Sequence, residues 1–161
     1  MTLSVFAFRL CLALVCGVLI GLERQLRQRS AGLTTNSLVA VGACVFILIS
    51  ETVIANALAE GGPVNNDNLR VLSQVVTGIG FLGAGVILRD GFTIHGLNSA
   101  ATLWCSAAMG CLCGYGFWRE AIIAVCFILF INWVLKWVEH TIENHSKDDP
   151  FADPYDKKGE R

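Results

Sequence analysis

Five long apolar runs constrain the fold of this chain more than any other feature of its sequence. They cover residues 3–21, 36–58, 69–88, 97–113 and 117–138. A helix needs about 20 mostly apolar residues to cross the roughly 30 Å of hydrocarbon in a bilayer, and every run is close to that length. All three prolines lie outside the runs, so none interrupts helical hydrogen bonding within them. The sequence therefore predicts an all-α, polytopic transmembrane bundle with five spans.

The composition also differs from that of a soluble protein. Hydrophobic residues make up 54% of the 161 residues and charged residues only 16%, whereas soluble domains carry about 25% charged residues. The formal net charge of −1 provides no basic surface, so a nucleic-acid partner is not expected. Most of the seven cysteines lie within the apolar runs and none forms a C-x₂-C pair, so they are expected to fill the core. No resident cofactor is predicted.

Basic residues predict the orientation of the spans. Three arginines follow Glu23 before the second run, Arg89 lies in the third connection, and four basic residues lie in residues 141–161. The second connection carries acidic residues only. Because basic connections stay on the cytoplasmic side, the N-terminus is predicted to face outside and the C-terminus inside. No A-x-A-like site follows the first run, so we expect it to be retained as a span and not cleaved as a signal peptide.

The same features predict the domain organisation. Residues 1–140 are expected to form one transmembrane domain, surrounded by the lipid bilayer. Residues 141–161 are polar and charged, and we expect them to form a disordered cytoplasmic tail.

Glycines in two of the runs predict close contacts between helices. Gly17 and Gly21 form a G-x-x-x-G pattern, which lets two helix backbones approach each other. Four glycines of the third run occupy two opposite faces of a helix at about 100° per residue, so this run is predicted to lie centrally. They are Gly78, Gly80, Gly83 and Gly85. The same string matches G-x-G-x-x-G, but without a βαβ context it does not indicate a dinucleotide site.

Polar residues at the predicted inner ends of the spans form the candidate site. Glu23 and Arg24 end the first run, Asn36 begins the second, Asp90 follows the third and Asn98 begins the fourth. Ionisable groups at membrane depth are costly, and a carboxylate there must be paired, hydrated or bound to an ion. Such a cluster could bind an ion, a small anion or a partner helix. The alternative interpretation is ordinary charged helix ends and hydrogen bonds between helices.

Several short strings form a specific pattern in combination. They are I-G-L-E-R at 20–24, A-G-L-T-T at 31–35, L-V-A-V-G-A at 38–43, G-I-G-F-L-G-A-G-V-I at 78–87, and G-L followed by A-A-T-L-W between 96 and 104. In this order they resemble the MgtC/SapB family of bacterial inner-membrane proteins over residues 10–140. The chain departs from the family pattern at Thr34, where arginine is expected, and at Asn98 and Ser99, where two threonines are expected.

The resemblance implies a role in adaptation to magnesium limitation, with the F-type ATP synthase among the candidate partners. The glycine faces favour a non-enzymatic protein that modulates other membrane proteins through helix contacts, and a homo-oligomer is a further option. The alternative is a transporter or channel for Mg²⁺, with oxygen ligands from Glu23, Asp90, Asn36 and Asn98. An intramembrane enzyme is the third option, but no nucleophile and base are assembled in the sequence.

Overall fold

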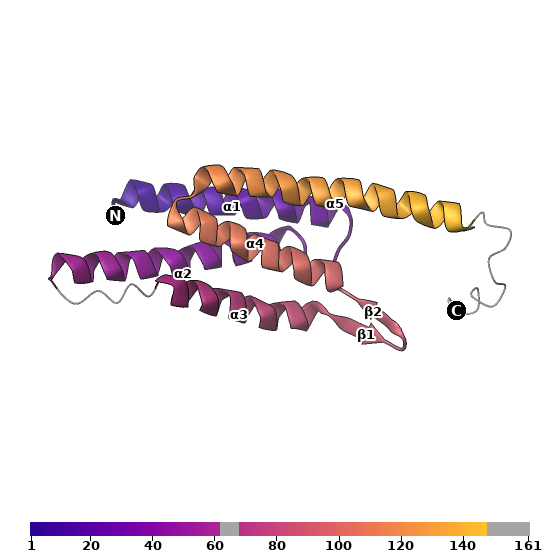
Figure 1. Ribbon diagram of the computed structural model, residues 1–161, viewed down its shortest axis with the longest axis horizontal. Coiled ribbons are helices and arrows are strands. Elements are labelled where there is room, and N and C mark those ends of the chain that lie inside the picture. The colour runs from indigo at the N-terminus through magenta and orange to yellow at the C-terminus, as the bar shows by residue number, and fades with distance from the viewer. Residues whose placement is uncertain (62–67, 148–161) are drawn as a thin grey trace. The chain divides into compact units, whose positions relative to one another are not determined.

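Helices dominate the structure of this protein. The computed structural model describes residues 1–61 and 68–147, with backbone alone for residue 68 and residues 135–147. The elements are α1 (Leu3–Leu26), α2 (Leu33–Ala59), α3 (Asn68–Val86), β1 (Leu88–Asp90), β2 (Thr93–His95), α4 (Leu97–Tyr115) and α5 (Trp118–Lys147) (Figure 1). Each predicted apolar run thus corresponds to a helix, although the third run extends two residues beyond the end of α3. By length and composition, α1, α2 and α3 are able to cross a membrane.

The chain divides into two compact units. The first comprises residues 1–126, which include α1 to α4, both strands and the start of α5. The second begins at Phe127, and its described part is the remainder of α5. This helix continues to Lys147, beyond the end predicted for the fifth span at residue 138. From residue 148 onward, the predicted tail lies outside the described residues.

Within the first unit, α2 and α4 form the centre. They pack against each other, and both also contact α1 and α3 (Figure 1). The buried residues of α1 recur every three or four positions, so they form one stripe along the helix. They are Ala13, Cys16, Gly17, Ile20, Gly21 and Arg24. Large apolar side chains such as Phe8 and Phe46 point outward instead, with 58% and 59% exposed, as expected for a surface in contact with lipid.

Glycines hold the three best-packed helices close together. A Cβ atom at Gly17 would lie 2.7 Å from the Cα of Ser37, and one at Gly21 would lie 2.7 Å from the Cα of Leu33. The G-x-x-x-G pattern of α1 therefore packs directly on the α2 backbone, as the sequence predicts. A second such pair, Gly110 and Gly114 on α4, packs on α2 from another side. The sequence analysis did not single out this pair.

The glycines of α3 behave differently. A Cβ atom at Gly78, Gly80 or Gly85 would meet no atom of another helix within 4 Å. A Cβ atom at Gly83 would be in ordinary van der Waals contact with the Cβ of Ala100, at 3.6 Å. Hence α3 lies at the side of the unit, and the central position predicted for it belongs to α2 and α4. A glycine permits close approach, but the approach also requires an opposing backbone, which Gly17, Gly21, Gly110 and Gly114 have and the glycines of α3 lack.

A β-hairpin connects α3 to α4, where the sequence analysis predicted a helix to residue 88 and a simple connection. Leu88 pairs with His95, and Asp90 pairs with Thr93, in an antiparallel register. Gly91 has a φ of 57° at the turn, and Gly96 has a φ of 88° where α4 begins. A side chain at Gly96 would overlap the carbonyl oxygen of Val86, so the chain can return to the helical bundle there only through glycine.

Candidate functional site: a polar network at one end of the bundle

Arg24 lies at the centre of a polar network at the end of α1. Only 1% of this residue is exposed. Its Nη1 atom donates a hydrogen bond to Oδ1 of Asn98 at 2.7 Å, and its Nη2 atom donates to Oγ of Ser99 at 2.6 Å. Ser30 donates to the same Ser99 oxygen at 2.9 Å, which brings the connection after α1 into the network. Arg24 thereby fastens α1 to the first turn of α4.

Asn36 makes the corresponding attachment for α2. It is fully buried, and its Nδ2 atom donates to the carbonyl oxygens of Ala31 at 3.1 Å and Gly32 at 2.8 Å. Its Oδ1 atom accepts a hydrogen bond from the Ser106 hydroxyl on α4 at 2.8 Å. The side-chain amide therefore satisfies backbone carbonyls of the connection and ties α2 to α4 at the same time.

The charges at this end are incompletely matched. Both hydrogen-bond acceptors of the Arg24 guanidinium named above are neutral, while the neighbouring Glu23 pairs with Arg27 at 2.6 Å, one helical turn away. The Oε2 atom of Glu23 and the Nε atom of Arg24 are buried and have no hydrogen-bond partner among the described residues. An unsatisfied buried polar group costs about 1–3 kcal/mol, so this end of the bundle retains unused binding capacity.

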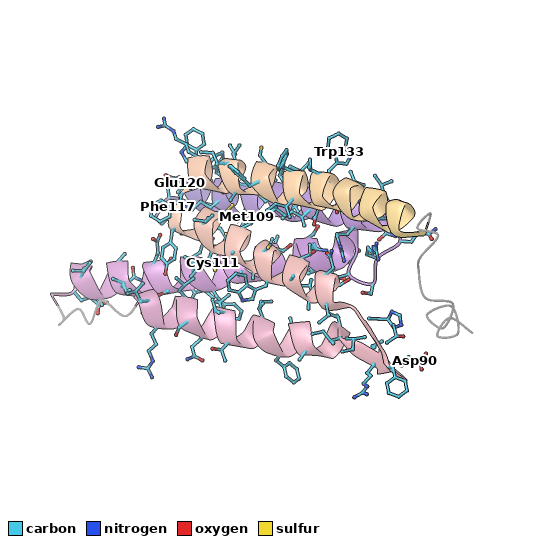
Figure 2. All side chains as sticks on the ribbon, turned by 45° about the vertical axis from the view of Figure 1, so that its right-hand side comes forward. Asp90, Met109, Cys111, Phe117, Glu120 and Trp133 are labelled. Atoms are coloured by element: carbon cyan, nitrogen blue, oxygen red, sulfur yellow. The ribbon has the colours of Figure 1, made fainter. Side chains whose placement is uncertain are left out.

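Asp90 lies apart from this network. It is the last residue of β1 and is exposed, and Figure 2 shows it on the β-hairpin. No hydrogen bond or ion pair connects it to Arg24 or Asn98 in the described part of the chain. Of the residues predicted from the sequence, the structure brings Arg24 and Asn98 into direct contact, places Asn36 and Glu23 at the same helix ends, and leaves Asp90 outside.

A second charged group lies at the other end of the bundle. Arg9 on α1 and Glu51 on α2 form an ion pair at 2.6 Å, with 19% and 30% of their side chains exposed. The same Nη1 atom of Arg9 donates to the carbonyl oxygen of Gly114, near the end of α4, at 2.6 Å. Arg9 thus joins three helices. The sequence analysis did not single out this pair.

The geometry of both ends is that of interhelical fastening, with a buried guanidinium at one end and an ion pair at the other. The described residues contain no group of three or more His, Cys, Asp or Glu side chains arranged to hold a metal ion. Among the described residues, the Oε2 atom of Glu23 is a buried carboxylate oxygen without a hydrogen-bond partner, and it could accept an additional donor or a cation.

Comparisons with known proteins identify the family. A family model described as the MgtC family matches residues 10–141. Protein MgtC of Brucella abortus (strain 2308) is 49% identical over 131 residues, which cover 81% of this chain and 51% of that protein. Protein MgtC of Salmonella typhimurium (strain LT2) is 50% identical over 131 residues, which cover 81% of this chain and 52% of that protein.

The chain therefore spans about half the length of the curated relatives it matches. No solved structure matches it. The matched region contains the polar network at one end of the bundle, Glu51 of the ion pair at the other, and most of the three helices with the length and composition to cross a membrane, while Arg9 lies one residue before it. This chain is a membrane protein that belongs to the MgtC family.

Proposed function

We propose that this protein is a non-enzymatic, multi-pass protein of the bacterial inner membrane that acts in adaptation to magnesium limitation. It would do so by contacting other membrane proteins through its helices. Family membership supports the physiological role, and the family resemblance makes the F-type ATP synthase a candidate partner. The observation that carries the mode of action is the outward face of α3.

This face consists of small and polar residues, together with one exposed aromatic ring. Gln74, Gly78, Phe81 and Gly85 lie at helical spacings that place them on one side of α3, and all four are exposed. Phe81 is 81% exposed. Lipid provides no hydrophobic driving force between helices, so helix pairs associate where small residues let backbones approach closely. A face of this kind on a membrane helix fits another helix better than it fits acyl chains.

The groove beside this face has room for such a helix. It lies between α2 and α3, has a volume of about 500 Å³, and is lined by Gly42 and Gly78 among mainly apolar side chains. A Cβ atom at either glycine would meet nothing within 4 Å. A helix from a partner protein, or from a second copy of this chain, could therefore approach both backbones.

One observation favours cation transport as a second candidate. The buried Oε2 atom of Glu23 has no hydrogen-bond partner among the described residues, and a hard cation such as Mg²⁺ prefers oxygen ligands. Mg²⁺ usually keeps several water ligands and binds one or two carboxylates, so a single carboxylate is a sparse site. We rank this candidate below the helix-contact function for that reason.

The Gly78→Leu variant tests the proposed function. In bacteria lacking their own family member, the unaltered protein is expected to restore growth at low magnesium, and the variant is expected to fail at equal membrane abundance. A leucine on the open face leaves the fold intact but separates the partner helix from α3. The measurements are growth rate at limiting magnesium and protein abundance in the isolated membrane.

The matched control is Val53→Leu, an apolar change on α2 at a side chain that is 61% exposed. It should grow like the unaltered protein. Normal growth of Gly78→Leu would contradict the use of this face. Purified protein in liposomes is expected to give only background Mg²⁺ flux, whereas a flux that Glu23→Gln removes would replace the proposed function by transport.

We further propose that all five helices cross the membrane, with the N-terminus outside and the C-terminus inside. The basic residues after α1 and in the β-hairpin support this orientation. A phosphatase reporter, active only outside the cytoplasm, is expected to be inactive after Arg161 and active when inserted after Glu60. The reverse result, or activity at both positions, would overturn the orientation or the number of spans.

A further inference from the structure

The β-hairpin between α3 and α4 exposes more apolar surface than a soluble loop of its size would. Leu88 is 66% exposed, Phe92 at the turn is 100% exposed, and Ile94 is 53% exposed. Arg89 is the register partner of Ile94, so these two residues lie on the same face of the two strands. The Nε atom of Arg89 donates a hydrogen bond to the carbonyl oxygen of Gly91 at 2.9 Å, which holds the Arg89 side chain against the turn. Exposed apolar surface of this kind marks a binding surface.

The length of α3 determines where this surface lies relative to a bilayer, if α3 crosses it as proposed above. A helix of 19 residues is about 28 Å long, close to the roughly 30 Å of bilayer hydrocarbon. The hairpin begins two residues after α3 ends, at Leu88, and therefore starts in the headgroup layer. That layer is only about 5–8 Å deep on each side. Strands of three residues span about 10 Å, slightly more than this depth, so a hairpin that is tilted toward the membrane plane stays within the headgroup layer.

We propose that the hairpin is an interfacial anchor for anionic phospholipid. Phe92 and Ile94 insert at the boundary between headgroups and acyl chains, and the guanidinium of Arg89, on the same face as Ile94, binds a lipid phosphate. Charge complementarity supports this occupant. Arg27 and Arg29 lie at the same end of the bundle as the hairpin. They follow Arg24 closely in the sequence, and Arg24 contacts the start of α4, directly after the hairpin. Together with Arg24 and Arg89, these arginines outnumber the carboxylates of Glu23 and Asp90 at this end, so anionic headgroups would match the excess of positive charge.

A photoreactive side chain at position 92 tests the proposal. The full-length protein, with Phe92 replaced by p-benzoylphenylalanine, is placed in vesicles of phosphatidylethanolamine and phosphatidylglycerol and irradiated. Mass spectrometry then identifies the adducts. We expect phospholipid adducts at position 92. The positive control is the same replacement at Val15, which is 52% exposed in the middle of α1, away from the α2–α3 groove, and should also react with lipid.

The charge of Arg89 is tested by two variants in the same assay. Arg89→Gln is expected to lower the phosphatidylglycerol share of the position-92 adducts about fivefold, since one basic residue near an anionic surface contributes about 1 kcal/mol. Arg89→Lys keeps the charge and should retain that share even though the bond to Gly91 is lost.

The outcomes separate this inference from the proposed membrane insertion. Lipid adducts at position 15 together with protein adducts at position 92 in bacterial membranes would overturn the anchor and assign the hairpin to a protein partner. Lipid adducts at position 15 with none at position 92 would mean that the hairpin lies in water, which also overturns it. A lack of lipid adducts at both positions would refute the membrane insertion itself. An unchanged phosphatidylglycerol share in Arg89→Gln would refute the phosphate contact.

Discussion

Replacing Gly110 by leucine is expected to destabilise the first unit strongly. A Cβ atom at Gly110 would overlap the carbonyl oxygen of Ala40 on α2, and it would lie 2.9 Å from the Cβ of Ala43. Backbone atoms cannot rotate out of the way, so the two central helices must move apart. Overpacking costs about 1–3 kcal/mol where side chains can adjust, and we expect a loss at or above the top of that range here. The measurement is the free energy of unfolding in mixed detergent micelles, with membrane abundance as a second readout.

The control for this prediction is Gly80→Leu. It makes the same chemical change in a helix of the same unit, but a Cβ at Gly80 would meet no atom within 4 Å. The Gly80→Leu protein should unfold at nearly the same detergent composition as the unaltered protein. Equal stability of both variants would show that α2 and α4 are not packed backbone to backbone, and the central place of these two helices would be wrong.

The second large effect is expected for Arg24→Lys. Lysine keeps the buried positive charge, but it cannot donate to Asn98 and Ser99 at once from the fixed fork that a guanidinium provides. A hydrogen bond to a charged group contributes about 1.5–3 kcal/mol, so we expect the variant to lose about 2 kcal/mol of folding free energy. That is about a thirtyfold change in the folding equilibrium.

Arg27→Lys is the matched control, because Arg27 is only one helical turn away and pairs with Glu23 near the surface. Exposed pairs of this type contribute about 0.3–0.5 kcal/mol, so its stability should hardly change. Growth at low magnesium should follow the stability of both variants if the network is only structural. If Arg24→Lys stays stable, Arg24 does not fasten α1 to α4. A stable Arg24→Lys protein that fails to support growth would instead assign Arg24 a direct role in function.

The packing of α1 on α2 shows that one of the ion pairs could have been predicted from the sequence. Arg9 lies 17 residues before the end of α1, and Glu51 lies 18 residues after the start of α2. Two antiparallel helices joined by a short connection bring residues at equal distances from that connection side by side. The Arg9–Glu51 pair could therefore have been predicted from these positions. Our sequence analysis missed it.

The third partner of Arg9 could not be found in the same way. Gly114 lies 105 residues away along the chain, and its carbonyl oxygen accepts the Arg9 hydrogen bond because α4 ends beside α1. The local sequence does not show which helices are neighbours when they are not joined by a short connection. The same limit applies to Arg24, whose acceptors are 74 and 75 residues away. The sequence predicted that Arg24 and Asn98 lie at the same end of the bundle, but it did not predict that they touch.

The sequence by itself determined the membrane character, the helices and the ends at which the polar residues gather. These properties depend on local composition and on the length of apolar runs, and they do not require contacts between helices. The tertiary structure decided which glycines are used, because Gly110 and Gly114 face a backbone whereas Gly78, Gly80 and Gly85 face open space. It also separated Asp90 from Arg24 by placing Asp90 in a hairpin, whose two positive-φ glycines bend the chain away from the helix end. Close approach and charge pairing are properties of two surfaces together, and only the folded chain brings those surfaces into contact.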